Sequence, residues 1–466
     1  MIQGTAPGSL GPAPPHESPQ PLAQRKDLDV SYDRSLEEVI AERAFAGLLQ
    51  GRSQALFRLS TALIAGDRGS WSKKHYYQLL LEAEELESFL DDYGARYNRS
   101  YGTIRELVAS TRWFALTGHG LAHLESRIGS YSALSTCSDA EASDFALSLE
   151  QVCSLARRAC VALLLEIRAE ASQLGLEITP ETLPEASFSA APVRMRLPRN
   201  VGEHEPTEEQ QKIAEVASKF IAACSMLDDL RVRRIKNPVE RKAYLSRLCS
   251  EEQARVYEAT VHNLQSTYDT YIKNTVLEGR DERLPKLRGL SSAALHLLEC
   301  ATFLTHFVER HEGSGRDSAQ RRLAEIIDER DVQDAILNVL LYWADFFLRR
   351  GRSVAEELLP AYTDVQELSI DLDGDIKLHA RPAALIVGIV GHYGTPVELD
   401  VGGKRCNAAS ILEVLVTVGT YAEVRRYIFR GDIRPLTDIK LLFESGLGER
   451  GLESLPPPLS YLKGRN

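Results

Sequence analysis

The sequence predicts a large all-α region, organised as one or two helical bundles, followed by a small α+β region at the C-terminus. From about Arg34 to Tyr362, good helix formers dominate and apolar residues recur three and four positions apart, which is the period of a helix with one buried face. After Gln366, short stretches of alternating apolar and polar residues are separated by turn residues and by apolar helical runs. Such alternation is typical of half-buried strands, and the mixture predicts helices packed against one face of a small sheet.

Residues 1–30 precede the helical pattern and contain many Pro, Gly, Ser and Gln residues without an apolar period. This composition predicts a disordered tail. The tail has no basic start followed by an apolar core, so it is not predicted to be a signal peptide. No run in the chain reaches the roughly 18 apolar residues that a membrane span requires, and we therefore expect a soluble protein without membrane insertion.

The helical region, residues 31–365, is long enough for a sizeable core and is expected to contain about eight helices. The longest interruption, residues 177–205, is rich in proline and polar residues and predicts an exposed loop or a hinge between two bundles. Shorter interruptions lie near 66–69, 98–102, 129–138, 237–238, 279–287 and 313–315.

Residues 366–450 alternate between strand and helix patterns, with turn signals at Asp373-Gly374-Asp375 and Gly402-Gly403. The predicted order is β-α-β-β-α-β-α, an antiparallel sheet with helices on one face. Residues 451–466 are expected to form a flexible tail. The predicted elements are a strand at 368–372, a helix at 380–392, strands at 397–401 and just after Gly403, a helix from Ile411 to Val418, a strand at 421–429 and a helix at 433–444.

The segment 377–383 (Lys-Leu-His-Ala-Arg-Pro-Ala) places His379 at the start of a predicted helix. Pro382 is tolerated in the first turn because the N–H that proline lacks would have no partner there. A helix N-terminus favours an anion, and Arg381 adds a second positive group. Neutral imidazole is a nucleophile near pH 7, so His379 is well placed to carry a phosphoryl group.

A second motif, residues 403–412 (Gly-Lys-Arg-Cys-Asn-Ala-Ala-Ser-Ile-Leu), places Ser410 31 positions after His379. With both motifs and this spacing, the segment 366–450 resembles the HPr family, the histidine-phosphorylated carriers of the bacterial phosphoenolpyruvate-dependent sugar phosphotransferase system. The segment departs from the family at Lys377, where a glycine is usual, and at Ile376, where a small polar residue is usual.

The resemblance implies the HPr-type open-faced β-sandwich and a phosphocarrier in the bacterial cytoplasm. Enzyme I would phosphorylate His379, which would pass the group to a IIA domain or a regulatory target. Arg381 would hold the phosphate and Pro382 would fix the helix start, without a metal or another cofactor. Such a relay carries a phosphoryl group and is not a classical turnover enzyme. The alternative is a regulatory sensor whose HPr-like domain reports phosphorylation and whose helical region binds a partner.

Ser410 has two explanations that the sequence leaves open. Residues 410–413 (Ser-Ile-Leu-Glu) match the capping box, in which the serine only caps the following helix. The resemblance implies instead that an HPr kinase/phosphorylase phosphorylates Ser410, and a phosphate is tolerated at a helix N-terminus.

Other candidate groups in the helical region are interpreted as structural. Metal binding would need more ligands than the sequence places together, and di-iron bundles use Glu-x-x-His in the opposite order. A helical metalloenzyme with a regulatory domain therefore remains only a third hypothesis. The groups are His119 and His123 with Glu125, the pairs His296/Glu299 and His306/Glu309, and the basic cluster Arg231, Arg233, Arg234 and Lys236.

The net charge of −11 and the pI near 5.6 argue against general binding to nucleic acid or to anionic membranes. The chain has seven cysteines, an odd number without paired spacing, which does not indicate a disulfide framework. Reduced cysteines are typical of the cytoplasm.

Overall fold

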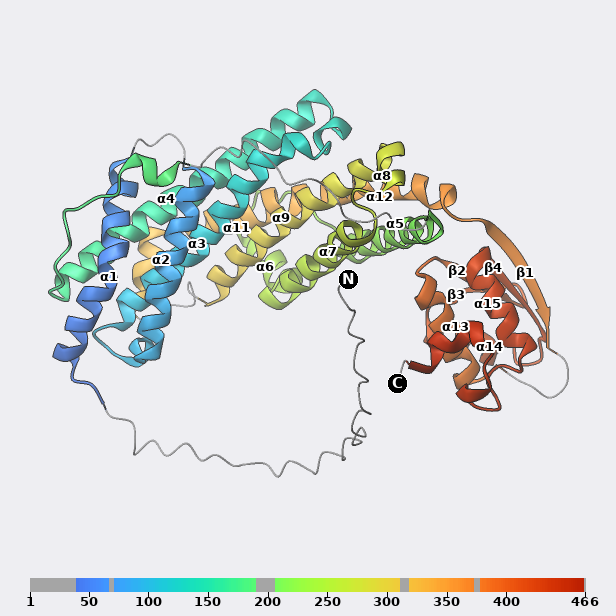
Figure 1. Ribbon diagram of the computed structural model, residues 1–466. Helices are drawn as coiled ribbons and strands as arrows, with labels where there is room; N and C mark the ends of the chain where they lie inside the picture. Colours follow the sequence, from blue (N-terminus) through green and yellow to red (C-terminus); the bar gives the residue numbers. More distant parts are fainter. Residues whose placement is uncertain (1–38, 67–70, 190–205, 311–317, 373–377, 465–466) are drawn as a thin grey trace, which may run out of the picture. The chain divides into compact units, whose positions relative to one another are not determined.

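The computed structural model describes residues 39–66, 71–189, 206–310, 318–372 and 378–464 of the 466-residue chain. The described chain is mostly helical, with a four-stranded antiparallel sheet near the C-terminus (Figure 1). The predicted tail at residues 1–30 lies outside the described residues. No helix in these described ranges is both long enough and apolar enough to cross a membrane.

The first half of the helical region is built around α3, which packs against both α2 and α4. Local signals begin the helices: at α4, Ser138 Oγ accepts the Glu141 N–H, while the Glu141 carboxylate accepts the Ser138 N–H. This reciprocal pair satisfies two N–H groups that would otherwise have no partner. The helices are α1 (Glu42–Ala65), α2 (Lys73–Asp92), α3 (Gly102–Arg127) and α4 (Asp139–Gln173).

The second half is built around α9, which packs against α7, α12 and also α3. The contact between α3 and α9 joins the two halves. A π-helical segment, η6 (Ala335–Leu341), separates α11 from α12. The helices are α5 (Pro206–Asp228), α6 (Pro238–Leu248), α7 (Glu251–Tyr271), α8 (Val276–Arg280), α9 (Arg283–Arg310), α10 (Ser318–Ile326), α11 (Glu329–Asp334) and α12 (Tyr342–Leu358).

The first part of the predicted hinge is not a free loop. The Gln50 side chain of α1 exchanges hydrogen bonds with the backbone of Glu177, at 2.8 and 2.6 Å. From α2, Lys74 donates to the Ser189 carbonyl, and the His75 ring stacks on Phe188 with 4.1 Å between centroids. Residues 177–189 are thus fastened along two helices, a long-range pairing that composition does not reveal. Residues 190–205 lie outside the described chain.

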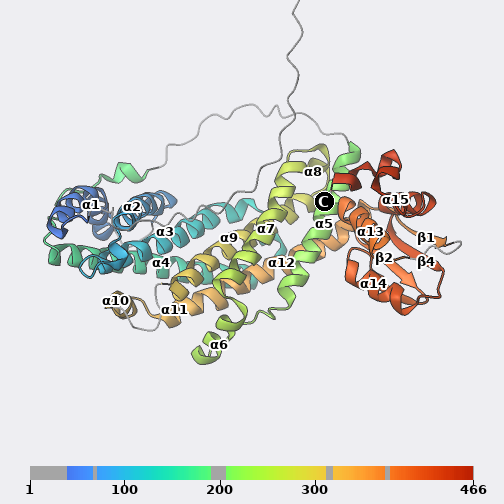
Figure 2. The same ribbon diagram turned by 90° about the horizontal axis from the view of Figure 1, so that it is seen from below.

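The C-terminal α+β region has the predicted element order, with α13, α14 and α15 on one face of the sheet (Figures 1 and 2). All strand pairs are antiparallel, in the order β1-β4-β2-β3. Gly402 and Gly403 both have positive φ and form the two-residue β2–β3 turn. The elements are β1 (Val365–Asp371), α13 (Ala380–Tyr393), β2 (Val397–Val401), β3 (Lys404–Asn407), α14 (Ile411–Thr420), β4 (Arg426–Asp432) and α15 (Ile433–Glu444).

Alternation along the strands places the core between sheet and helices. In β2, Val397, Leu399 and Val401 are buried while the residues between them are not, as expected for one covered face. The fourth strand lies later than predicted, at 426–432 and not 421–429, because α14 continues to Thr420 and a turn from Tyr421 to Val424 follows it.

The prediction of a flexible tail at 451–466 is wrong for most of that segment. Two 3₁₀ segments, η8 (Leu452–Ser454) and η9 (Pro457–Gly464), pack against the α+β core. Leu455, Leu459 and Leu462 are buried in that core. Tyr461 donates a hydrogen bond to Asp438 of α15 at 2.6 Å. Apolar burial outweighs the polar and proline-rich appearance of the segment.

Candidate functional site

His379 is the N-cap residue of α13, the position just before the first helical residue. Its backbone is extended, with φ −124° and ψ −167°, and its Nδ1 atom accepts the N–H of Arg381 at 3.4 Å. The side chain is 53% exposed. The imidazole thus performs the capping role usually taken by Ser, Asn or Asp, while its ring remains accessible from solvent.

The other ring nitrogen contacts a residue that the sequence analysis missed. His379 Nε2 lies 2.7 Å from Glu449 Oε1. An ionised carboxylate only accepts hydrogen bonds, so this contact requires the proton on Nε2. Nδ1 is then unprotonated, and its lone pair points to the start of α13, where it accepts the long hydrogen bond from the Arg381 N–H. Nδ1 is therefore the candidate nucleophilic nitrogen.

Glu449 is positioned by the end of α15. The N–H of Gly446 donates to the Phe443 carbonyl and the N–H of Leu447 donates to the Leu442 carbonyl, a Schellman motif that reverses the chain. Leu447 is fully buried, which anchors the turn. Gly448 has positive φ and packs so closely on Leu385 of α13 that a Cβ there would lie 2.6 Å from a Leu385 methyl carbon. The turn therefore carries Glu449 to the start of α13.

Arg381 and Pro382 occupy the second and third positions of α13. Arg381 is exposed, and its guanidinium makes no ion pair with any residue in the described ranges. Pro382 is buried and contributes no N–H, while the Ala383 N–H bonds back to the His379 carbonyl. An anion at Nδ1 would thus meet the first two helix N–H groups and one available guanidinium. Lys377 and Ile376 lie outside the described residues.

Ser410 is the N-cap residue of α14 and accepts the Glu413 N–H at 3.4 Å. The predicted capping box is only half formed, because the Glu413 carboxylate accepts the N–H of Asn407 and not that of Ser410. α13 and α14 pack together, but among the described residues no hydrogen bond or ion pair joins the side chains of His379 and Ser410.

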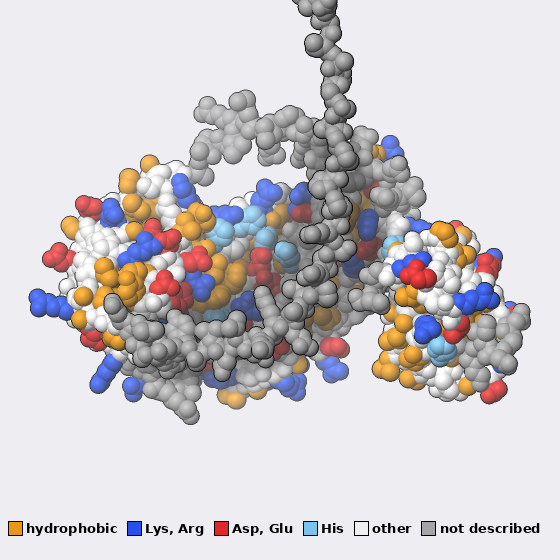
Figure 3. Space-filling model, turned by 60° about the horizontal axis from the view of Figure 1, so that its bottom comes forward, with side chains coloured by type: hydrophobic (Ala, Val, Ile, Leu, Met, Phe, Trp, Pro, Cys, Tyr) orange, Lys and Arg blue, Asp and Glu red, His pale blue; other side chains and the backbone are white. Residues whose placement is uncertain are grey.

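Two histidines of the helical region lie in ring contact. The rings of His123 on α3 and His296 on α9 meet edge to face, 4.7 Å between centroids. Lys73 Nζ lies 2.9 Å from His123 Nδ1, and His296 Nδ1 lies 2.8 Å from Glu299. Burial, His296 and Lys73 lower the pKa of His123 to about 4. Figure 3 shows histidines gathered on one face of this region. Within the described ranges, no group of three or more His, Cys, Asp or Glu side chains is arranged to hold a metal ion.

The remaining candidates connect structural elements. His306 Nδ1 lies 2.9 Å from Glu251, and its ring contacts that of Trp113 at a tilt of 33°. Glu309 accepts the N–H of Glu251 at 2.9 Å. In the basic cluster, Arg234 pairs with Asp144 at 2.9 Å and lies over the Tyr342 ring. These contacts give His306, Glu309 and Arg234 structural roles that need no bound ligand.

No protein-family model matches the chain, and no solved structure is significantly similar to it.

Proposed function

We propose that residues 366–450 are an HPr-like phosphocarrier domain, which accepts a phosphoryl group on His379 from enzyme I and passes it to a IIA domain or a regulatory target. The proposal rests on one arrangement above all. Glu449 holds the proton on Nε2, while Nδ1 presents its lone pair at a helix N-terminus beside Arg381. The two sequence motifs, their spacing and the element order support it further.

The transfer balances without an additional cofactor. The Nδ1 lone pair attacks the phosphorus of the donor phosphohistidine, an Nδ1–P bond forms, and the N–P bond of the donor breaks. The ring keeps its Nε2 proton and becomes an imidazolium, whose positive charge the Glu449 carboxylate stabilises. In the second transfer the Nδ1–P bond breaks as a nucleophile of the acceptor attacks, and neutral imidazole returns. Positioning and charge neutralisation are most of what such a reaction needs.

The surroundings of the site suit transfer between proteins. An exposed ring can enter the active site of a donor and then that of an acceptor. On α14, Leu412 and Val416 are exposed apolar side chains that follow Ser410. Exposed apolar patches are typical docking surfaces, and a phosphate on Ser410 would add negative charge beside this one. We propose that an HPr kinase/phosphorylase acts there.

Phosphorylation by enzyme I tests the function directly. The full-length protein, incubated with radiolabelled phosphoenolpyruvate and enzyme I, should take up one acid-labile, base-stable label. His379→Ala should abolish the label, whereas His262→Ala, at an exposed position of α7, should leave it unchanged. Failure to label, or label that persists in His379→Ala, contradicts the proposal.

A chase with a IIA domain separates the carrier from the sensor. If the protein is a carrier, the label should move from His379 to the IIA domain during the chase. Retention of label on His379 would favour the regulatory sensor instead. A cavity between α3 and α4 in the helical region separately supports the sensor. A relay of phosphate between two proteins does not require such a cavity.

A further inference from the structure

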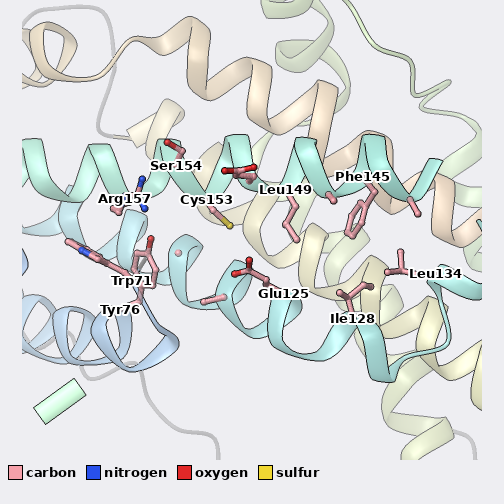
Figure 4. A pocket seen from close by; sticks show the side chains of 15 residues that line it. Trp71, Tyr76, Glu125, Ile128, Leu134, Phe145, Leu149, Cys153, Ser154 and Arg157 are labelled. Atoms are coloured by element: carbon pink, nitrogen blue, oxygen red, sulfur yellow. The ribbon is translucent and has the colours of Figure 1, made fainter. Parts of the chain in front are cut away.

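A cavity of about 450 Å³ lies between α3 and α4, bounded at one end by Tyr76 of α2 and by Trp71, two residues before that helix (Figure 4). Small residues on the two long helices line this space: Ala122 on α3, and Ala142 and Ala146 on α4. Gly118 on α3 makes room for the Tyr76 ring. The volume is within the range of small-molecule sites. The cavity is independent of the His379 site and has no part in the proposed phosphoryl transfer.

The lining divides into an apolar and a polar part. In Figure 4, Ile128, Leu134 and Phe145 lie together at one end, and Trp71, Tyr76 and Arg157 lie at the other. Between them, Glu125 on α3 points toward Cys153 on α4. A ligand that fits both parts has an apolar body and a polar or charged group.

Tyr76 is a polar residue that lines this cavity and is almost entirely buried. The side chain is only 4% exposed, and its ring packs so closely on Gly118 that a Cβ there would lie 2.1 Å from a ring carbon. Its hydroxyl makes no hydrogen bond with any residue that the structure describes. Burial raises the pKa of Tyr76 far above its ordinary value, so the group stays a neutral phenol. A ligand in the cavity would offer this hydroxyl a hydrogen-bond partner.

The charges of the lining are unequal. Glu125 and Glu150 line the cavity, and neither carboxylate forms an ion pair within the described chain. Among the described residues that line the cavity, Arg157 is the one cation. Burial, followed by the charges of Glu125 and then Glu150, raises the pKa of Cys153 to about 12 despite Arg157. The Cys153 thiol therefore stays neutral, and the described lining holds two carboxylates, both partly open to solvent, against one guanidinium.

We propose that this cavity binds a small organic ammonium ion with an apolar, preferably aromatic, body. The ammonium group would lie at Glu125 and Glu150, where it neutralises two carboxylates. The body would extend toward Phe145 and Ile128, and Trp71 and Tyr76 offer ring faces on which a cation is favourable. An anion of the same shape would be repelled by the carboxylates of Glu125 and Glu150. In a zwitterion, repulsion between its carboxylate and these glutamates would cancel the attraction of that carboxylate to Arg157.

Three probes of one shape and different charge test the proposal by titration calorimetry on the full chain. They are 2-phenylethylamine, phenylalanine and 3-phenylpropionate, which share the phenyl body. We expect 2-phenylethylamine to bind at least tenfold more tightly than the other two. No binding of the amine, equal binding of phenylalanine, or preference for the acid would each overturn the proposal.

Variants locate the binding. Glu125→Gln and Glu150→Gln should each weaken amine binding at least fivefold, whereas Glu282→Gln, at a side chain 87% exposed on the helical surface, should not change it. Ala146→Trp should block the cavity without changing its charge. The thermal melt of each variant is first compared with that of the native protein to show that the variant is folded. A loss of binding in a folded variant is then assigned to the cavity. Unchanged affinity in all three cavity variants would show that the amine binds elsewhere and refute the proposal.

Discussion

The His379 imidazole contacts one acceptor and one donor, and these neighbours give its two nitrogens opposite roles. Glu449 accepts a hydrogen bond from the Nε2–H, and the Arg381 N–H donates to Nδ1. A histidine is often tuned through the group bound to its second nitrogen. Glu449 acts here through His379 and is therefore a positioning residue.

Glu449→Gln should slow the labelling of His379 about fivefold, because a partly exposed ion pair contributes up to about 1 kcal/mol. Glutamine still accepts from Nε2 but carries no charge to stabilise the phosphorylated ring. Nitrogen NMR of the ring should show the Nε2–H tautomer in the native protein and a mixture of tautomers in Glu449→Ala. Glu453→Gln, in the same C-terminal segment, is the control. A native-like rate and tautomer in both Glu449 variants would contradict this role.

Two substitutions of Ser410 separate its effect as a helix cap from the effect of a negative charge at this position. Ser410→Ala should destabilise the α14 end by about 1 kcal/mol, because it removes the N-cap oxygen, but should leave the labelling rate of His379 near native. Ser410→Asp keeps a good cap and adds charge, so it should preserve stability and slow labelling. Hydrogen exchange of α14 measures the first effect and initial labelling rates the second. Native-rate labelling of Ser410→Asp would refute regulation by charge.

At the scale of elements, the C-terminal 3₁₀ segments behave as part of the α+β core. Leu459 is fully buried, whereas Leu412 on α14 is 70% exposed. The two leucines therefore form a matched pair for testing burial in this region.

Leu459→Ala should destabilise the C-terminal region by about 2–5 kcal/mol, since a buried leucine loses both transfer and cavity terms. Leu412→Ala should change stability by no more than about 0.5 kcal/mol yet weaken docking of enzyme I. Hydrogen exchange of β4 and α15 reports the first effect, and the concentration dependence of labelling the second. Equal stability of the two variants would show that the segment is not part of the core.

The π-helical segment η6 is hydrogen-bonded to a loop that is distant in the sequence. Asn338 accepts the N–H of Ile235 at 2.7 Å and donates to the Ile235 carbonyl at 3.0 Å. Its amide also donates to Asp334, four residues earlier, at 2.7 Å. An irregular turn of helix is thus held by a loop about a hundred positions away, one of the identifiable causes of such irregularities.

At the scale of the whole molecule, the packing of α3 on α9 brings half-buried titratable groups together, and pH acts on them with a definite sign. His123 has a pKa near 4 in the folded chain, below the value of about 6.5 for an unperturbed histidine. The unfolded chain therefore binds more protons between these values. Stability from this group is present above about pH 6.5 and is lost as the pH falls toward 4.

Glu251 acts in the same direction at lower pH. Burial opposes its ionisation, but hydrogen bonds from His306, Arg255 and Arg310 outweigh burial and lower its pKa to about 2. Its stabilisation is present above the ordinary carboxylate value of about 4.3 and is lost below it.

The melting temperature of the full chain should fall between pH 6.5 and 4, and His123→Gln should flatten that part of the profile. Glutamine occupies a similar volume and cannot take up a proton beside Lys73 and His296. His262→Gln, at an exposed position of α7, should show the same dependence of melting temperature on pH as the native protein. An identical slope in native protein and His123→Gln would show that this histidine does not couple pH to folding.

The sequence by itself determined the mostly helical chain and the small antiparallel sheet at its end. Helix α15 begins at Ile433 and ends at Glu444, and β2 covers Val397–Val401, both as predicted. Helix caps, turn glycines and apolar periods are local signals, so they can be recognised in the sequence without the tertiary structure. The position of His379 at the start of a helix follows for the same reason.

The tertiary structure alone decided which distant residues meet. Glu449 reaches His379 through the Gly446–Gly448 turn, His123 meets His296 across two helices, and Tyr76 closes a cavity between α3 and α4. The fastening of residues 177–189 and the burial of the C-terminal leucines belong to the same class. Each depends on packing between segments far apart in the chain, and no periodicity within one segment encodes that packing.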